Sequence, residues 1–309
     1  MSFNHIPVLF NETVDSLDVR PDGIYVDCTA GGGSHSAAVL EKLTTGRLYC
    51  IDRDPNAIAH LHERFADAGD RVRIVHNTFD RIDEILTADA VYGKCAGVMA
   101  DLGVSSVQLD TAERGFSFHN DAPLDMRMSC EGISAADIVN TYSETELARI
   151  LFEYGDEKFS RSIAKNIVKA REIKKIESTF ELVDIIKSSM PAKAMRDGHP
   201  ARRTFQALRI ETNSEITLLE EAIGKMFGAL EPGGTLAIIS FHSLEDRVVK
   251  NKFREFCQGC ICDPRAPICT CGRTPDGKIK HKPITPGDTE LAENNRSRSA
   301  KLRTIIKLK

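Results

Sequence analysis

The sequence contains no apolar run approaching the roughly 20 residues that a membrane-spanning helix needs. Its first residues, Met1-Ser2-Phe3-Asn4-His5, lack the basic-then-apolar order of a secretion signal. We therefore expect a cytoplasmic protein with no membrane partner. The 309 residues, 41% of them hydrophobic, are enough for one large domain or two of ordinary size.

The chain also lacks a net positive charge, because its formal net charge at pH 7 is −4. This balance argues against a protein that coats nucleic acid. The basic residues are nevertheless clustered, in residues 161–175, 193–209, 273–282 and 296–309. An acidic average with cationic clusters is typical of an enzyme that docks on one RNA surface, although a single cluster is equally typical of a solvated helix face or tail.

Short apolar runs alternate with helical patterns in the first hundred residues. The runs cover residues 24–28, 48–51, 72–76 and 96–100. This alternation predicts a mostly parallel sheet with right-handed crossovers, in which ligands bind beyond the carboxyl ends of the strands. The candidate ligand-binding residues are therefore those that follow the strands, namely Gly31 to His35, Asp52, Phe79 and Asp101.

The glycine turn at residues 29–35 favours a nucleoside cofactor. Asp52 follows it by about twenty residues, the spacing expected of a carboxylate that accepts hydrogen bonds from ribose hydroxyls. A dinucleotide site requires Gly-x-Gly-x-x-Gly facing a pyrophosphate, whereas this turn reads Gly-Gly-Gly-Ser-His. S-adenosylmethionine carries no phosphate, and the Pro232-Gly233-Gly234 stop before an apolar run is typical of methyltransferase sheets. The pattern favours S-adenosylmethionine, with a dinucleotide-linked oxidoreductase as an alternative.

The middle of the chain is predicted to be helical. Residues 143–146 and 178–181 both match the S/T-x-x-E capping box that begins a helix. Between them Phe159, Ile163 and Ile167 recur at helical spacing. We expect an inserted all-helical domain over residues 106–200, within a discontinuous α/β domain made of residues 1–105 and 201–309.

Residues 199–210 combine arginines with rings and an amide, which is the chemistry of an RNA grip. Arginine pairs with phosphate, rings stack on unpaired bases and glutamine reads base edges. The alternative is an ordinary helix with Ala201, Phe205 and Leu208 in a core and the arginines solvated. The residues expected to bind RNA are His199, Arg202, Arg203, Phe205, Gln206 and Arg209.

Cysteine is concentrated in one segment, with five residues between positions 257 and 271. Thiolates at short spacing form tetrahedral zinc sites, but the Cys-x-Cys pairs here depart from the usual Cys-x-x-Cys knuckles. In an extended strand the two cysteines of such a pair point to opposite faces, so both can ligate one ion only where the chain turns. The sequence leaves open a structural zinc site or a loop of free thiols, and in neither case a catalytic metal. The cysteines are Cys257, Cys260, Cys262, Cys269 and Cys271.

Seven motifs in one order resemble those of a known family. They are residues 5–9 (HIPVL), 101–108 (DLGVSSVQ), 114–118 (RGFSF), 123–128 (PLDMRM), 199–210, 240–247 (SFHSLEDR) and 296–303 (RSRSAKLR). The chain resembles the bacterial 16S ribosomal RNA cytosine-N4 methyltransferases, also called the MraW or small-subunit methyltransferase H family, from end to end. Ser34 departs from the Gly-Gly-His that members commonly have, which favours a backbone contact there. A second departure, Asn294-Asn295 where a proline often precedes Arg296, carries no inference.

The resemblance implies a class I, Rossmann-like methyltransferase fold and methyl transfer from S-adenosylmethionine to the N4 amine of a decoding-centre cytidine. The implied partner is 16S rRNA in the assembled small subunit. The oligomeric state stays open, with a homodimer as one option. Carried over residue by residue, the implied cofactor contacts are Gly33, Ser34, His35, Asp52, Phe79, Asp101 and Gln108.

Four residues are candidates for the chemistry. Asp101 and Ser105, after the fourth strand, are best placed to accept a hydrogen bond from the amine. Asp125, with Arg127, contacts the base or phosphates, or else forms a structural ion pair. His242 is a proton acceptor or, more commonly at such a position, a histidine bonded to backbone. A base-stacking ring would come from Phe116, Phe118 or Phe241.

The alternative function for the whole protein is a non-catalytic nucleotide-binding assembly factor.

Overall fold

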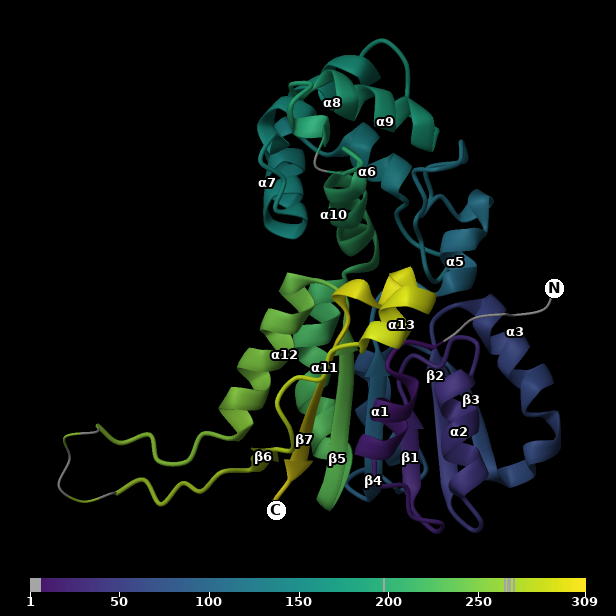
Figure 1. Ribbon diagram of the computed structural model, residues 1–309, viewed down its shortest axis with the longest axis vertical. Coiled ribbons are helices and arrows are strands. Elements are labelled where there is room, and N and C mark those ends of the chain that lie inside the picture. The colour runs from purple at the N-terminus through teal and green to yellow at the C-terminus, as the bar shows by residue number, and fades with distance from the viewer. Residues whose placement is uncertain (1–6, 197, 264, 266–267, 269) are drawn as a thin grey trace. The chain divides into compact units, whose positions relative to one another are not determined.

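The computed structural model describes residues 7–196, 198–263, 265, 268 and 270–309 (Figure 1). The chain divides into two compact units. The first unit combines Met1–Gly103 with Ile216–Lys309, and the second unit is the intervening Val104–Glu215. Among the described residues, no helix combines the length and apolar character needed to cross a bilayer.

The first unit is built on one sheet. Its described strands are β1 (Ile24–Asp27), β2 (Arg47–Asp52), β3 (Val72–His76), β4 (Cys95–Asp101), β5 (Leu230–Ser240), β6 (Gly277–Ile279) and β7 (Lys301–Lys307). The order across the sheet is β3-β2-β1-β4-β5-β7-β6. Strands β1 to β5 pair in parallel, whereas β7 is antiparallel to both β5 and β6. The mostly parallel sheet predicted from the apolar runs is confirmed.

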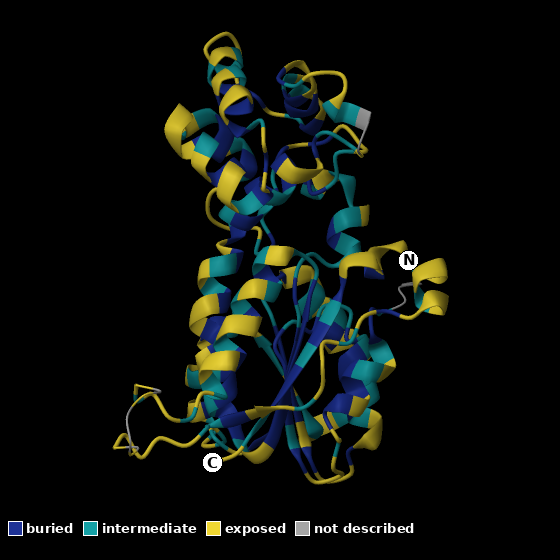
Figure 2. Cartoon of the chain, turned by 60° about the vertical axis from the view of Figure 1, so that its left-hand side comes forward, coloured by how far each residue is buried: buried dark blue, intermediate teal, exposed yellow. Residues whose placement is uncertain are grey.

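Both faces of this sheet are covered by helices. The helices of the first unit are α1 (Phe10–Ser16), α2 (Ser34–Lys42), α3 (Pro55–Arg64), α4 (Ile82–Ala88), α11 (Glu215–Ala229), α12 (Ser243–Phe256) and α13 (Asp288–Glu293). Successive strand residues point to opposite faces, so in β2 Leu48 and Cys50 join one apolar cluster and Tyr49 and Ile51 join another. The first cluster includes side chains of α2 and α3, and the second those of α4, α11 and α12. Figure 2 shows the resulting pattern, with buried strands between helices whose outer faces are exposed.

The described residues of the second unit form helices and no named strand. The helices are α5 (Ser106–Asp110), α6 (Ala135–Thr141), α7 (Glu144–Gly155), α8 (Ser160–Arg171), α9 (Thr179–Ser188) and α10 (Arg202–Asn213). Ser143 and Ser178 cap α7 and α9 with both bonds of the capping box, as the sequence predicted. A single apolar cluster holds the unit together, with Ile163 and Ile167 of α8 completely buried in it.

The second unit extends beyond residue 200, where the sequence placed its end. Helix α10 belongs to this unit because it contributes its apolar face to the unit's core. Ala201, Phe205 and Leu208 are all buried in that cluster. The compact unit therefore ends at Glu215, just after the left-handed Ser214 that separates α10 from α11.

Candidate active site

The turn between β1 and α2 needs glycine at its last position. Gly33 has φ 73°, in the left-handed region, and a Cβ atom there would lie 2.9 Å from Leu61 Cδ2. Its N–H donates to the Ala30 carbonyl at 2.7 Å, which closes the turn before α2 begins at Ser34. The backbone is thus brought close to the carboxyl end of β1, where the sequence predicted a cofactor turn.

The carboxylate of Asp52 fastens this turn. Its Oδ2 atom accepts the Gly31 N–H at 2.7 Å, and its Oδ1 atom accepts the Asp54 N–H at 2.8 Å. Burial raises the pKa of Asp52, although these backbone N–H groups oppose the shift. Asp52 therefore has hydrogen-bond partners within the protein itself. Each oxygen still has a second lone pair, so the carboxylate can also accept ribose hydroxyls.

Asp27, at the end of β1, is an acidic residue that the sequence analysis missed. It is buried, and it accepts hydrogen bonds from the Ser36 hydroxyl at 2.6 Å and the Thr29 N–H at 3.2 Å. Burial raises the pKa of Asp27 to about 6, with Asp52 adding to the shift. Its place as the last residue of a strand, before the glycine turn, is the signal that could have identified it.

Asp101 ends β4 and carries an oxygen that is available to a ligand. Its N–H donates to the Thr29 hydroxyl at 2.6 Å, and its Oδ2 atom lies 4.0 Å from Nδ1 of His35. Within the described residues, its Oδ1 atom is buried without a hydrogen-bond partner. Burial raises the pKa of Asp101 well above its ordinary value, and the charges of Asp27 and Glu245 raise it further.

Three aspartates end β1, β2 and β4, and Glu245 lies in the first turn of α12; burial opposes the ionisation of the three aspartates. Asp27, Asp52, Asp101 and Glu245 all lie in the first unit, and electrostatic interactions are stronger where water is excluded. A ligand with positive charge and hydrogen-bond donors fits them. S-adenosylmethionine has a sulfonium, an ammonium and ribose hydroxyls, so these residues suit it. Phe79 begins a 3₁₀ turn (Phe79–Arg81) after β3, half-buried against the apolar core.

His242 is a helix cap in this structure. Its Nδ1 atom accepts the Glu245 N–H at 3.4 Å, and Glu245 accepts the N–H groups of His242 and Phe241 in return. This is a capping box with imidazole in place of a hydroxyl. The Nε2 atom lies 3.1 Å from Glu245 Oε1. The backbone-bonded alternative therefore describes His242 better than a proton acceptor.

Ser105 and Gln108 serve a second capping box, at the start of α5 in the second unit. The Ser105 hydroxyl accepts the Gln108 N–H at 3.2 Å, and Gln108 Oε1 accepts the Ser105 N–H at 3.0 Å. The Gln108 side chain is buried. Ser105, expected in catalysis, and Gln108, expected in cofactor binding, thus both have a structural role at the start of α5.

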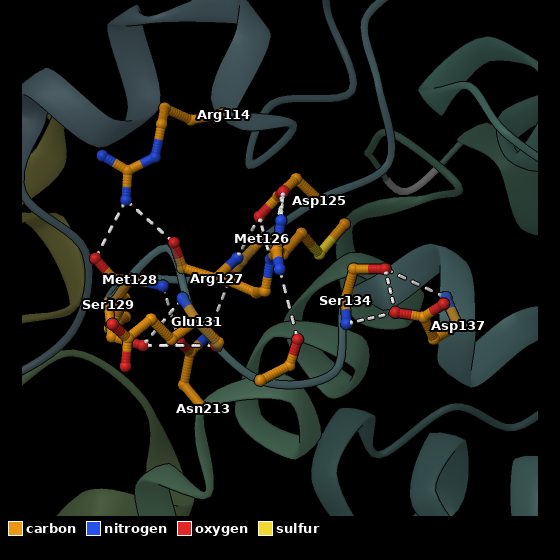
Figure 3. Close-up of polar contacts among 11 residues, drawn as sticks. Arg114, Asp125, Met126, Arg127, Met128, Ser129, Glu131, Ser134, Asp137 and Asn213 are labelled. Atoms are coloured by element: carbon orange, nitrogen blue, oxygen red, sulfur yellow. Dashed lines mark hydrogen bonds and ion pairs between the residues drawn. The ribbon is translucent and has the colours of Figure 1, made fainter.

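Asp125 and Arg127 form a structural ion pair within the second unit (Figure 3). Arg127 reaches Asp125 through Nε and Nη2, the latter at 2.6 Å, and its Nη1 donates to the Gly132 carbonyl at 3.2 Å. Burial alone would raise the pKa of Asp125, but the guanidinium outweighs it and lowers that pKa. Arg114 and Asn213 fasten the same loop through backbone atoms of residues 126–128. A pocket of about 390 Å³ beside the pair has both acidic and basic lining residues, which does not favour a phosphate.

Helix α10 matches the ordinary-helix alternative more closely than the RNA grip. Phe205 is only 3% exposed, so the expectation that it stacks on a base is corrected: its ring belongs to the core. Gln206 Nε2 donates to the Tyr154 carbonyl at 2.9 Å, and Arg209 forms two 2.8 Å hydrogen bonds with Glu215. Arg202 and Arg203 remain exposed, although Arg203 donates to a backbone carbonyl of residue 156.

The candidate stacking rings differ in what already covers them. Phe116 is 6% exposed, in the core of the second unit. Phe118 already stacks on His199, with ring centroids 4.2 Å apart and 10° between the planes. Phe241 is partly buried beside the sheet, and Gly103 approaches its ring without a Cβ atom. Phe118 and Phe241 are both partly buried, and of these two only Phe118 has a stacked ring among the described residues.

The strand order with an antiparallel β7, the glycine turn after β1 and the carboxylate ending β2 define an S-adenosylmethionine-dependent methyltransferase of class I. The model of the MraW methylase family matches residues 2–308, and the chain belongs to this family. The class, the family and the methyl donor predicted from the sequence are confirmed.

Named relatives match over the whole chain. The Ribosomal RNA small subunit methyltransferase H of Clostridium botulinum (strain Kyoto / Type A2) is 53% identical over 311 residues, covering 100% of both chains. That of Lachnospira eligens is 50% identical over 312 residues, covering all of this chain and 99% of the relative. That of Clostridioides difficile (strain 630) is 49% identical over 313 residues, with both chains covered in full.

Proposed function

We propose that this protein transfers a methyl group from S-adenosylmethionine to the exocyclic N4 amine of a decoding-centre cytidine in 16S rRNA. The printed name of the relatives supports ribosomal RNA of the small subunit as the substrate. The observation that carries the proposal is the buried Oδ1 atom of Asp101, which has no partner among the described residues and lies beside the glycine turn. A buried carboxylate oxygen in that state favours a ligand that donates a hydrogen bond.

The cofactor contacts proposed in the first unit are Gly33, Ser34, His35, Asp52, Phe79 and Asp101. Gly33 and Ser34 act through backbone, because they close the turn and begin α2. Asp52 holds the turn and accepts ribose hydroxyls, and its bond to Gly31 couples the two tasks. When bound, the donor supplies a methyl group already activated by the sulfonium.

Catalysis is proposed to be mainly positioning. The lone pair of a cytosine amine is delocalised into its ring, so the nitrogen is a weak nucleophile. An acceptor for its hydrogen, which we assign to Asp101, localises that lone pair, and correct alignment can contribute several of the roughly 7–11 kcal/mol available from orientation. Burial and the neighbouring acids disfavour the ionised form of Asp101, whereas the positive charge of a bound donor favours it, and in that form the carboxylate accepts the hydrogen bond.

Exposed cations of the second unit are proposed to contact RNA phosphates. Arg161, Lys165 and Lys169 are exposed and follow one another at four-residue spacing, which places them on one face of α8. Arg202 is exposed at the start of α10. Point charges and guanidinium groups on such faces bind phosphate without reading sequence.

Methylated-nucleoside analysis tests the proposal. Small-subunit RNA from cells that lack the protein should lose N4-methylated cytidine, and purified protein with S-adenosylmethionine should restore it. A non-catalytic assembly factor would bind the subunit and transfer no methyl group. Methylation of another nucleoside, or none with intact cofactor binding, would contradict the proposal.

A further inference from the structure

The cysteine-rich segment lies between α12 and β6, at residues 257–276. Hydrogen bonds close its base, where the Asp276 N–H donates to the Phe256 carbonyl at 2.9 Å and Lys309 Nζ donates to Thr274 Oγ1 at 2.9 Å. Its described part has no helix or strand, and Ile261 and Ile268 are 56% and 74% exposed. A segment longer than about 15 residues without such elements needs another source of order, and a metal is a common one in small folds.

Three thiols of this segment converge. The sulfur atoms of Cys260, Cys262 and Cys271 all lie within 4.8 Å of one another. The Cys260 and Cys271 sulfurs are 3.7 Å apart. A disulfide would bring them to about 2.05 Å. Two sulfurs on one tetrahedral zinc ion, each bonded at about 2.3 Å, lie about 3.8 Å apart. The Cys271 thiol donates a hydrogen bond to the Cys260 sulfur at this distance, and the same spacing suits two ligands of one metal ion.

The chain turns where the Cys-x-Cys pair requires it. The Cys262 N–H donates to the Cys260 sulfur at 3.4 Å, which bends residues 260–262 and brings both thiols to one side. The obstacle posed by an extended Cys-x-Cys pair is therefore removed. The Thr270 hydroxyl lies 3.7 Å from the Cys262 sulfur, close enough to orient it from outside the ligand set.

We propose that Cys260, Cys262 and Cys271 bind one zinc ion, which orders the segment between α12 and β6. Each thiol loses its proton to solvent as its sulfur–zinc bond forms, and nothing is oxidised or reduced. Three thiolates with nitrogen or oxygen in the fourth position, or a fourth thiolate, suit zinc. Cys257 is the remaining described thiol of the segment, while Cys269 lies outside the described residues. The site is structural, and it stands independently of the proposed methyl transfer.

Metal analysis tests this assignment. The full chain is purified with a reductant and without chelator, and its zinc content is measured by mass spectrometry. We expect about one zinc per chain, and a loss of at least five-fold in Cys260→Ser and Cys271→Ser. Cys130→Ser, which changes an exposed cysteine of the second unit, is the matched control and should keep its zinc. Less than a tenth of an equivalent in the parent, with all thiols of the segment titratable, overturns the proposal.

Limited proteolysis gives a second readout that does not depend on the variants. Arg265 and Arg273 offer trypsin two sites within the segment. Extraction of the metal should speed cleavage there several-fold while S-adenosylmethionine binding stays unchanged, and added zinc should restore protection. Cleavage at the same rate with and without the metal overturns the structural role. Full zinc content in the Cys260→Ser, Cys271→Ser double variant overturns the ligand assignment.

Discussion

The carboxylates of Asp27, Asp52 and Asp101 sit at three strand ends where burial disfavours their charge. The pKa of each is raised: for Asp27 and Asp52 desolvation exceeds the opposing effect of hydrogen bonds, and for Asp101 the charges of Asp27 and Glu245 add to desolvation. Acids perturbed in this way are typical of functional sites, since a cationic ligand can supply the favourable interaction that the protein alone does not. We therefore expect these carboxylates to lower the stability of the folded chain and to strengthen the binding of a cationic ligand.

Replacing Asp101 with alanine should lower turnover by about 100-fold, the scale of a lost proton-accepting group. Binding of S-adenosylmethionine should weaken by less. Since the pKa of Asp101 is raised by burial and by Asp27 and Glu245, stability should not fall. Steady-state kinetics, calorimetry and thermal unfolding measure the three effects. Asp22→Ala, at the exposed amino end of β1, is the control, and an equal loss of binding and turnover would contradict the assigned role.

Asp27 should make stability fall as the pH rises. Its pKa is about 6 in the folded state against an ordinary 3.8, so the folded chain holds a proton that the unfolded chain releases. The stability from this group is complete below pH 3.8 and is lost as the pH rises through 6, a change on the order of 3 kcal/mol. Urea unfolding measures the free energy of unfolding of the parent and of Asp27→Asn from pH 4.5 to 7.5. The value for the parent should fall relative to that of the variant as the pH rises. Parallel curves would contradict it.

Helix α10 carries an arginine that is exposed and one that is held in an ion pair. Arg202 is exposed, whereas Arg209 has a bidentate bond with Glu215. Arg202→Glu should weaken RNA binding several-fold without changing cofactor affinity or stability. Arg209→Glu should instead lower the free energy of unfolding by about 1–3 kcal/mol, because it leaves Glu215 beside a like charge. Filter binding and urea unfolding distinguish them, and identical RNA defects with unchanged stability would contradict this division.

How far the sequence predicts an element depends on how local its signal is. Strands β1 to β4 are apolar runs bounded by turns, and α7 and α9 begin with recognisable caps, so all of these were predicted. Strand β7 was not, because its alternating basic residues were interpreted as a cationic tail. In the structure Arg303 and Lys301 bond to Asp246 of α12, more than fifty residues away in sequence.

The site residues show the same limit. The turn at Gly33 and the strand-end positions of Asp52 and Asp101 follow from local order alone. A backbone bond is the commoner expectation for His242, but the capping box itself is not recognised because imidazole replaces the usual hydroxyl. The position of Asp27 at the end of β1 is a local signal, whereas its burial depends on the packing of the whole sheet. Two alternatives stay open for Phe205 in the sequence, a ring against RNA or a ring in a core, because helical spacing does not distinguish them.

For the whole molecule, an acidic average with exposed cations on α8 predicts a wide phosphate footprint. The enzyme should act on assembled small subunits or a late precursor rather than on a short hairpin. RNA affinity should fall at least 10-fold between about 50 and 200 mM salt, while cofactor affinity stays nearly constant. Binding measured across salt for the parent and for Lys165→Glu checks this, with a shallower dependence expected in the variant. Equal methylation rates on hairpin and subunit would contradict it.

The interruption of the first unit by the second also sets an order of events during synthesis. Strands β4 and β5 are hydrogen-bonded neighbours, yet the ribosome makes the whole second unit between them. That unit is continuous in sequence and has its own core, so it can fold before β5 is made and pairs with β4. Strand β5 then waits for residues 241–300 before β7 exists to cover its edge, about 3–12 s at 5–20 residues per second. For that interval the nascent sheet has an open edge, which makes the newly made chain, rather than the finished protein, the form most exposed to aggregation.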